Sequence, residues 1–303
     1  MKIIDTMTPG KPFLSLEFFP PKERAEWPAF FNTVERLREL NPLFASVTYG
    51  AGGSTHGDSL EIVSRLKQEH GLETMAHLTC IGAQGSDVHA FLDELTRVGV
   101  DNVLALRGDL SQETPPESSP HRPLRYASDL VALIRRSHPH IGLGVAAYPE
   151  VHPEAASPEE DLAYLMLKLD HGADFAITQL FFDNRLYFDF VRNACNNGIT
   201  KPIIPGILPV VSLKVVKRIV SLCGTVIPPD FMAQLEEADR RGGAAEVQKL
   251  GVAHARSQTE ELLANGAPGV HLYTLNRPDA VLEVTAGVSA LAGGLRRTHR
   301  PGP

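Results

Sequence analysis

The sequence predicts an α/β protein that folds as a single-domain (β/α)8 barrel, the TIM barrel. Eight short apolar runs recur along the 303 residues, and segments with helical periodicity separate them. The runs are rich in Val, Ile, Leu and Ala and do not alternate strictly with polar residues, as expected for parallel strands covered on both faces. This alternation, repeated eight times, favours a closed barrel; a doubly wound open sheet is the alternative.

The apolar runs define the expected strands. They lie near residues 13–18, 44–49, 74–80, 102–106, 142–147, 174–180, 202–207 and 270–274. Helical spacing fills the intervals, as where Leu162, Leu165 and Leu169 recur on one helix face. Ser157 and Ser212 precede expected helices, where a hydroxyl can cap free backbone N–H groups. The pattern therefore gives both the strands and the starts of several helices.

The expected barrel occupies residues 1–294. A stretch at about 224–268 is longer than one helical connection, and we expect it to form a helical elaboration in two parts, broken at a pair of glycines. Residues 111–123 are rich in Pro, Ser and Glu and indicate a loop after the fourth strand. Residues 295–303 are expected to form a short, basic, flexible tail.

Composition and charge argue against several classes of protein. The net charge of −7 comes without any extended basic field, which argues against nucleic acid as a partner. No run approaches the roughly 18 apolar residues of a membrane helix, and the N-terminus lacks the apolar core of a secretory signal. Cys80, Cys195 and Cys223 are far apart and lack CxxC spacing, which argues against disulfides and zinc. These features together predict a cytoplasmic protein.

Polar side chains at the carboxyl ends of the expected strands carry most of the unusual chemistry, because those ends meet at one face of a parallel barrel. Glu17 lies at the end of the first strand, beside Phe18 and Phe19. An apolar setting raises the pKa of a carboxyl group, which suits a general acid near neutral pH. The alternative is a structural carboxylate paired with a base such as Arg107.

The segment Arg107-Gly108-Asp109 ends the fourth strand. Gly108 would let a ligand approach the backbone, and Asp109 could accept hydrogen bonds from the N–H groups of a heterocycle. A turn with a surface salt bridge is the alternative. His77 and His152 lack the close spacing of common zinc sites, so we expect no metal site. Each histidine could contact a cofactor or lie satisfied in the core.

Short strings along the chain resemble those of the methylenetetrahydrofolate reductase family. The strings are LEFFPPK (16–22), VTYG (47–50), HLTC (77–80), LALRGD (104–109), AAYPEVHPE (146–154), ITQ (177–179), IPGILP (204–209) and YTLNR (273–277). They occur in the family's order, and the similarity runs from about residue 13 to residue 290. The chain resembles bacterial forms, which consist of the catalytic barrel without the regulatory domain of animal forms.

The resemblance implies an enzyme that binds FAD at the carboxyl face of the barrel. It implies reduction of 5,10-methylenetetrahydrofolate to 5-methyltetrahydrofolate, with NAD(P)H as the donor and ping-pong hydride transfer through flavin N5. Glu17 then matches the general acid that protonates N10 of the folate, and Asp109 matches a carboxylate near flavin and pterin. Gln179, Tyr273 and Arg277 match substrate-binding residues. The implied partners are these small molecules, and we expect a homo-oligomer.

The resemblance also implies a set of cofactor contacts. They are Thr48, His77, Arg107, Gly108, Asp109, Tyr126, Tyr148, His152, Asp161 and Lys168. Two positions depart from the family. Leu213 stands where related enzymes carry a Phe that packs on substrate, and an aliphatic side chain cannot stack in the same way. Tyr164 replaces an Asn associated with FAD.

Two other functions fit the same strings. One is a barrel that binds reduced folate without redox turnover, and the other is the same reductase with its flavin reduced by a partner protein. The preference for NADH or NADPH and the physiological direction of the reaction stay open.

Overall fold

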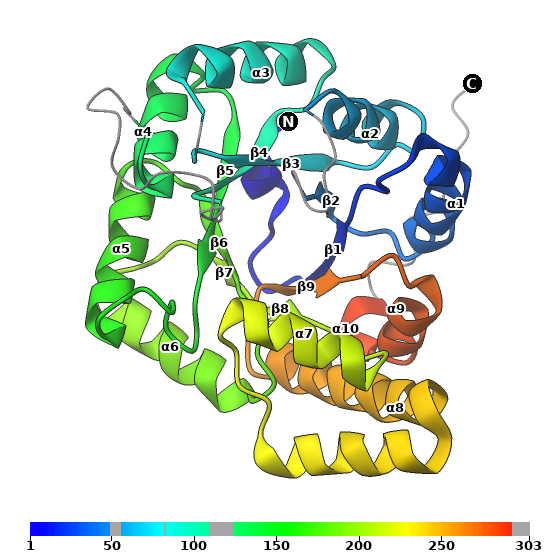
Figure 1. Cartoon of the computed structure of the whole chain (residues 1–303). Coiled ribbons are helices and arrows are strands. Elements are labelled where there is room, and N and C mark those ends of the chain that lie inside the picture. Colours follow the sequence, from blue (N-terminus) through cyan, green and yellow to red (C-terminus); the bar gives the residue numbers. More distant parts are fainter. Residues whose placement is uncertain (49–55, 82, 109–123, 293–303) are drawn as a thin grey trace.

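Parallel strands form a ring at the centre of the molecule, and helices surround it (Figure 1). The computed structural model describes residues 1–48, 56–81, 83–108 and 124–292. The expected loop 111–123, the expected tail 295–303 and Asp109 lie outside the described residues. The strands are β1 (Phe13–Phe18), β2 (Phe44–Val47), β3 (Thr74–Thr79), β4 (Asn102–Leu106), β5 (Gly142–Ala147), β6 (Phe175–Thr178), β7 (Ile203–Ile204), β8 (Gly206–Ile207) and β9 (Gly269–Tyr273).

The ring closes through one interrupted strand. The order of neighbours is β7-β6-β5-β4-β3-β2-β1-β9-β8, and every pair is parallel. Segments β7 and β8 are separated only by Pro205, which has no N–H group to donate to a neighbouring strand. Because β7 pairs with β6 and β8 pairs with β9, this strand joins the two ends of the sheet. The (β/α)8 barrel is confirmed, and the open-sheet alternative is wrong.

Helices follow the strands around the outside. They are α1 (Trp27–Arg38), α2 (His56–Gln68), α3 (Gly85–Arg97), α4 (Ala127–Ser137), α5 (Pro158–Asp170), α6 (Asn184–Asn196), α7 (Leu213–Cys223), α8 (Pro229–Ala264), α9 (Pro278–Thr285) and α10 (Ser289–Ala292), with 3-10 helices η1 (Ile3–Thr6) and η2 (Arg24–Glu26). The expected break in α8 occurs at Gly242 and Gly243, both non-helical. Ser157 Oγ accepts a hydrogen bond from Glu160 N and caps α5, whereas Ser212 precedes α7 without a side-chain cap.

Alternation along each strand separates an outer core from the barrel interior. In β1, Leu14, Leu16 and Phe18 belong to the large core cluster that packs against the helices. Phe13 belongs to a second cluster, to which strands around the ring contribute side chains. Ser15 follows Phe13 by two residues and Glu17 follows it by four. Successive side chains of a strand point to opposite faces, so Phe13, Ser15 and Glu17 all point inward. The carboxylate of Glu17 therefore lies above an apolar floor.

Among the described residues, no helix is long and apolar enough to cross a membrane. Cys80, Cys195 and Cys223 are not in disulfides.

Candidate active site

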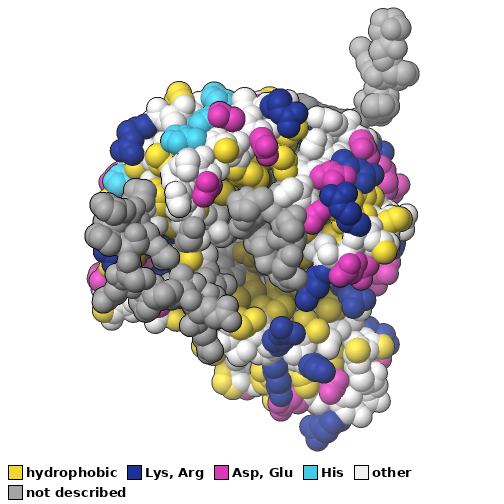
Figure 2. All heavy atoms as spheres, turned by 45° about the horizontal axis from the view of Figure 1, so that its top comes forward, with side chains coloured by type: hydrophobic (Ala, Val, Ile, Leu, Met, Phe, Trp, Pro, Cys, Tyr) yellow, Lys and Arg dark blue, Asp and Glu magenta, His cyan; other side chains and the backbone are white. Residues whose placement is uncertain are grey.

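A cavity of about 660 Å³ opens at the carboxyl ends of the strands. Figure 2 shows it as a hollow with hydrophobic side chains inside. The residues that line it include Glu17, Phe19, Thr48, His77, Thr79, Ile81, Leu104, Leu106, Arg107, Gly108, Ala146, Tyr148, His152, Ile177, Gln179, Leu180, Leu208, Ile219, Leu222, Cys223, Tyr273 and Leu275. A mostly apolar cavity of this size with a few convergent polar groups is typical of cofactor and substrate sites.

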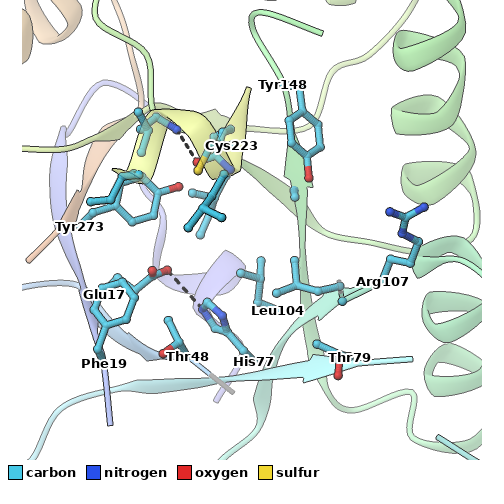
Figure 3. A pocket seen from close by; sticks show the side chains of 18 of the residues that line it. Glu17, Phe19, Thr48, His77, Thr79, Leu104, Arg107, Tyr148, Cys223 and Tyr273 are labelled. Atoms are coloured by element: carbon cyan, nitrogen blue, oxygen red, sulfur yellow. Dashed lines mark hydrogen bonds and ion pairs between the residues drawn. The ribbon is translucent and has the colours of Figure 1, made fainter. Parts of the chain in front are cut away.

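Glu17 lies on the wall of this cavity and is only 6% exposed. Its Oε2 lies 3.3 Å from His77 Nε2 (Figure 3) and 3.4 Å from His271 Nε2. Ser46 Oγ donates to the same oxygen at 3.4 Å. Strand register explains this grouping, because Glu17 pairs with Ser46 of β2 on one side and with Tyr273 of β9 on the other.

The expected effect of this setting on the Glu17 carboxyl is wrong in sign. Burial alone raises its pKa, but the positive charge of His77 and the hydrogen bond from His271, with smaller contributions of the same kind, outweigh burial and lower the pKa from 4.5 to about 2. The sequence-based prediction rested on the neighbours Phe18 and Phe19 alone. In the structure, Phe18 points out of the barrel into the large core cluster. The resting carboxyl group is therefore ionised, with imidazole groups in contact with it.

His271 connects Glu17 to a second polar group deeper in the barrel. Its Nδ1 lies 2.8 Å from Ser15 Oγ, and that hydroxyl donates to Val270 O at 3.2 Å. The Ser15 oxygen is then the acceptor, so His271 Nδ1–H donates to it and Nε2 faces Glu17. His271 is fully buried and its ring stacks on Phe44 at 5.8 Å, which holds the imidazole in place.

Several of the cofactor residues implied by the resemblance also line the cavity. Thr48 and His77 are less than 9% exposed. His77 Nε2 contacts Glu17, whereas Thr48 Oγ1 has no hydrogen-bond partner among the described residues. A buried polar atom of this kind is normally satisfied, so Thr48 Oγ1 indicates a ligand that supplies the partner. Gly108 has φ +87°, and a Cβ there would lie 3.0 Å from Thr79 Cβ. These features fit a group such as FAD, which needs polar contacts and close backbone approach.

Arg107 and His152 complete this side of the cavity. Arg107 forms two hydrogen bonds of 2.5 Å with Glu154, and it lies beside Tyr148 in Figure 3. The Tyr148 and His152 rings meet edge to face at 4.7 Å. Burial lowers the pKa of His152, and the charge of Arg107 lowers it further, which favours the neutral imidazole.

Asp161 and Lys168 support this wall from behind rather than lining the cavity. Asp161 Oδ2 accepts from His152 N at 3.0 Å, and Lys168 Nζ donates to Ala146 O at 2.6 Å. Burial lowers the pKa of Lys168 to about 8, although the charge of Asp161 opposes this. Both therefore fix the backbone that carries the cavity residues.

The substrate residues divide into two groups. Gln179 and Tyr273 line the cavity, and Tyr273 Oη donates to Thr178 O at 2.7 Å. Burial raises the pKa of Tyr273 well above 10, so its hydroxyl stays protonated. Arg277 is exposed at the start of α9, and Leu213 is partly buried against the cluster between α7 and α8; neither lines the cavity.

Tyr126, Tyr164 and Asp109 were also singled out from the sequence. Tyr126 precedes α4 and is 52% exposed, and Tyr164 on α5 is 50% exposed and donates to Glu160 Oε1 at 2.9 Å. Neither lines the cavity. Asp109 lies outside the described residues, so its role stays a prediction.

Sequence reasoning missed several residues of the site. His271 and Ser46 carried no signal as isolated residues, although each is two residues from a polar side chain, Tyr273 or Thr48, on the same strand face. Ile219 and Leu222 of α7 line the cavity, and Leu222 is 75% exposed. An exposed Leu at a cavity rim cannot be told from an ordinary surface Leu in a sequence.

Comparison with known proteins gives one family. A family model described as methylenetetrahydrofolate reductase matches residues 2–289. The 5,10-methylenetetrahydrofolate reductase of Escherichia coli (strain K12) is 40% identical over 271 residues, covering 89% of this chain and 88% of that protein. Methylenetetrahydrofolate reductase (NADH) 1 of Arabidopsis thaliana is 38% identical over 290 residues, covering 91% of this chain. The chain spans only about half the length of this Arabidopsis thaliana protein and of its relatives from Oryza sativa subsp. japonica and Zea mays, 49% in each case.

A solved structure shares the fold. It is an uncharacterized protein from Clostridium thermocellum that binds two copies of 5-methyl-5,6,7,8-tetrahydrofolic acid, with a TM-score of 0.63 over 96% of this chain and 97% of that chain. At 15% identity this likeness concerns the fold alone. The family is shown by the match over residues 2–289 and by the Escherichia coli relative. The chain belongs to the methylenetetrahydrofolate reductase family.

Proposed function

We propose that the protein reduces 5,10-methylenetetrahydrofolate to 5-methyltetrahydrofolate, with FAD as cofactor and NAD(P)H as electron donor. The observation that carries the proposal is Glu17, a buried carboxylate that contacts His77 and His271 on the wall of a large cavity. A site that only binds folate does not need an ionisable group with two imidazoles in contact. Family membership and the activity for which the relatives are named support the same reaction.

FAD, when bound, would supply the hydride-transfer chemistry between the nicotinamide and the folate. Thr48, His77, Gly108 and Tyr148 would contact the cofactor, since these residues line the cavity. Asp161 and Lys168 would hold the backbone of the cavity wall in place. Arg107 and His152 would extend the wall, because both line the cavity. Asp109 would orient the pterin and support positive charge on the folate.

Glu17 would deliver the proton that opens the five-membered ring of the folate at N10. Its carboxyl group is ionised in the resting site because His77 and His271 lower its pKa. A folate that covers Glu17 removes the remaining water, and desolvation raises the pKa of a carboxyl group. The proton then moves from an imidazole to Glu17 and on to N10; the C–N10 bond breaks, and the resulting iminium carbon accepts the hydride.

Two residues would orient the folate. Leu180 N donates to Gln179 Oε1 at 2.9 Å, so the amide nitrogen of Gln179 is the donor end available to the pterin. Tyr273 lies beside Glu17 on the neighbouring strand β9 (Figure 3). Burial keeps its hydroxyl protonated by raising its pKa. Arg277 at the rim would attract the carboxylates of the folate tail.

Product analysis tests the proposal. Protein freed of flavin and then supplied with FAD, NADH or NADPH, and methylenetetrahydrofolate should form 5-methyltetrahydrofolate, and omission of FAD should abolish it. Folate binding without turnover under all these conditions would support the non-redox folate-binding alternative. Turnover only with chemically reduced flavin would support a partner protein as the electron donor.

A further inference from the structure

The loop after β5 carries a glutamate that the proposed reaction does not use. Glu150 lies between Tyr148 and His152, both of which line the main cavity. Its Oε2 accepts a hydrogen bond of 2.9 Å from Val226 N, in the segment after α7. Glu150 thus connects the loop that carries the cofactor-side residues with the helix that carries Leu222 of the opposite wall.

The loop after β5, which Glu150 connects to the segment after α7, has a strained backbone. Val151 has φ +73°, a conformation that a β-branched residue rarely adopts unless its surroundings enforce it. The end of α7 packs closely on the same loop, since a Cβ on Gly224 would lie 2.6 Å from Pro153 Cγ. Glu150 is the side chain that ties the two segments together by a hydrogen bond.

The second oxygen of Glu150 lies at a small cavity. Glu150 Oε1 is buried and has no hydrogen-bond partner among the described residues. Glu150, Gln179 and Thr225 all line a cavity of about 10 Å³, which is about the volume one water molecule needs. Burial raises the pKa of Glu150, and the charge of Asp183 raises it further, as expected for a carboxyl group whose solvation is incomplete.

The other polar groups at this cavity suit a bridging water. Gln179 Oε1 is occupied by Leu180 N, which leaves the Gln179 amide nitrogen as a donor. Thr225 Oγ1 donates to Leu180 O at 3.0 Å and keeps lone pairs to accept. A water here can accept from Gln179 and donate to Glu150 Oε1 and Thr225. Gln179 also lines the main cavity, so the same amide would be fixed on one side and free for substrate on the other.

We infer that Glu150 is a positioning residue: it fastens the loop after β5 to the segment after α7 and, through a water molecule in the small cavity, fixes the Gln179 amide for the folate. The inference rests on the proposed function, because Gln179 is the group through which it acts. It predicts that the effects of Glu150 and Gln179 on folate binding are coupled.

A double-mutant cycle measures this coupling, with 5-methyltetrahydrofolate as the probe and calorimetric Kd as the readout on the FAD-loaded protein. Glu150→Ala should weaken binding about tenfold in the wild type but at most about twofold in the Gln179→Ala background. Asp174→Asn is the control, because Asp174 accepts from Leu143 N at 2.8 Å, before β6 and away from the cavity. It should lower stability and leave the Kd unchanged.

A second variant separates positioning from folding. Glu150→Gln keeps a carbonyl for Val226 N–H and should unfold at the wild-type temperature, yet it turns an N–H donor toward the water that Gln179 already faces. We expect binding about threefold weaker than wild type. Wild-type affinity in both Glu150 variants, or additive losses in the cycle, would overturn the inference. If the wild-type protein itself binds no 5-methyltetrahydrofolate, the proposed function fails instead.

Discussion

Replacing Glu17 with Gln should separate the two halves of the proposed reaction. The amide is nearly the same size as the carboxyl group, and it can keep neutral contacts with Ser46, His77 and His271, whose atoms lie 3.3–3.4 Å from Oε2. It cannot carry a proton to N10. Hydride transfer from nicotinamide to flavin needs no such proton, so we expect it to keep a rate close to that of the wild type.

The size of the effect follows from the role of Glu17. A positioned general acid contributes about 10²–10⁴-fold, or about 3–5 kcal/mol of transition-state stabilisation. Anaerobic stopped-flow measurement of flavin absorbance gives both half-reactions on one preparation. We expect the folate half-reaction of Glu17→Gln to fall by about 10²–10⁴-fold while flavin reduction changes by less than about threefold. Equal losses in both half-reactions would refute the assigned role.

The same variant gives a pH test that does not depend on activity. The pKa of Glu17 is about 2 in the folded protein against 4.5 as the ordinary value, so unfolding takes up about one proton between these pH values. The stabilisation is fully present above pH 4.5 and is lost as pH falls toward 2. Glu17→Gln should therefore remove a slope of about 1.4 kcal/mol per pH unit from the unfolding free energy in this window. An unchanged slope in urea titrations would contradict the ion contacts.

Three further predictions concern packing, the rim and the undescribed carboxylate. A Cβ on Gly206 would lie 2.4 Å from Thr178 O and 2.7 Å from Tyr273 Cε2. Gly206→Ala should therefore lower the unfolding free energy, measured by urea denaturation, by about 1–3 kcal/mol, and a loss below about 0.5 kcal/mol would contradict this packing. Leu222→Ala should raise the KM for folate about tenfold with little change in stability. Val215→Ala, on the same helix but away from the cavity, should leave the KM unchanged. Equal KM values in the two variants would exclude a substrate contact by Leu222. Asp109→Asn should slow the folate half-reaction in stopped flow and shift the flavin potential, and a wild-type rate would make it structural.

The barrel could be predicted because its signals are local. The apolar runs at 102–106 and 142–147 coincide with β4 and β5, since strands buried on both faces differ strongly from the helices between them. The interruption at Pro205 was not predicted, because the run at 202–207 reads as one strand. Pro205 interrupts the strand only at its own position, because it has no N–H group to donate. The ring still closes because β8 pairs with β9.

The candidate site could be predicted only where residues act from strand ends. Glu17, His77 and Tyr148 do line one cavity, as the parallel arrangement requires. The charge state of Glu17 could not be predicted, because it depends on His271, which is 254 residues away in sequence and comes into contact only through the pairing of β1 with β9. The sequence neighbours Phe18 and Phe19 suggested the opposite shift.

The rim of the cavity shows what a resemblance leaves open. Leu213, which the resemblance places among the substrate residues, is partly buried against the cluster that α7 and α8 share, while Leu222 and Ile219 of the same helix line the cavity. Which face of α7 points to the cavity depends on how this helix lies across the barrel mouth, and the helical repeat alone does not give that orientation.

The central claim is most directly tested by the absorbance spectrum of the FAD-loaded protein without oxygen, titrated first with NADH or NADPH and then with methylenetetrahydrofolate. The account predicts that the nicotinamide bleaches the oxidised flavin bands and that the folate restores them with release of one 5-methyltetrahydrofolate per flavin. Bleached flavin that stays reduced in the presence of excess methylenetetrahydrofolate would contradict it.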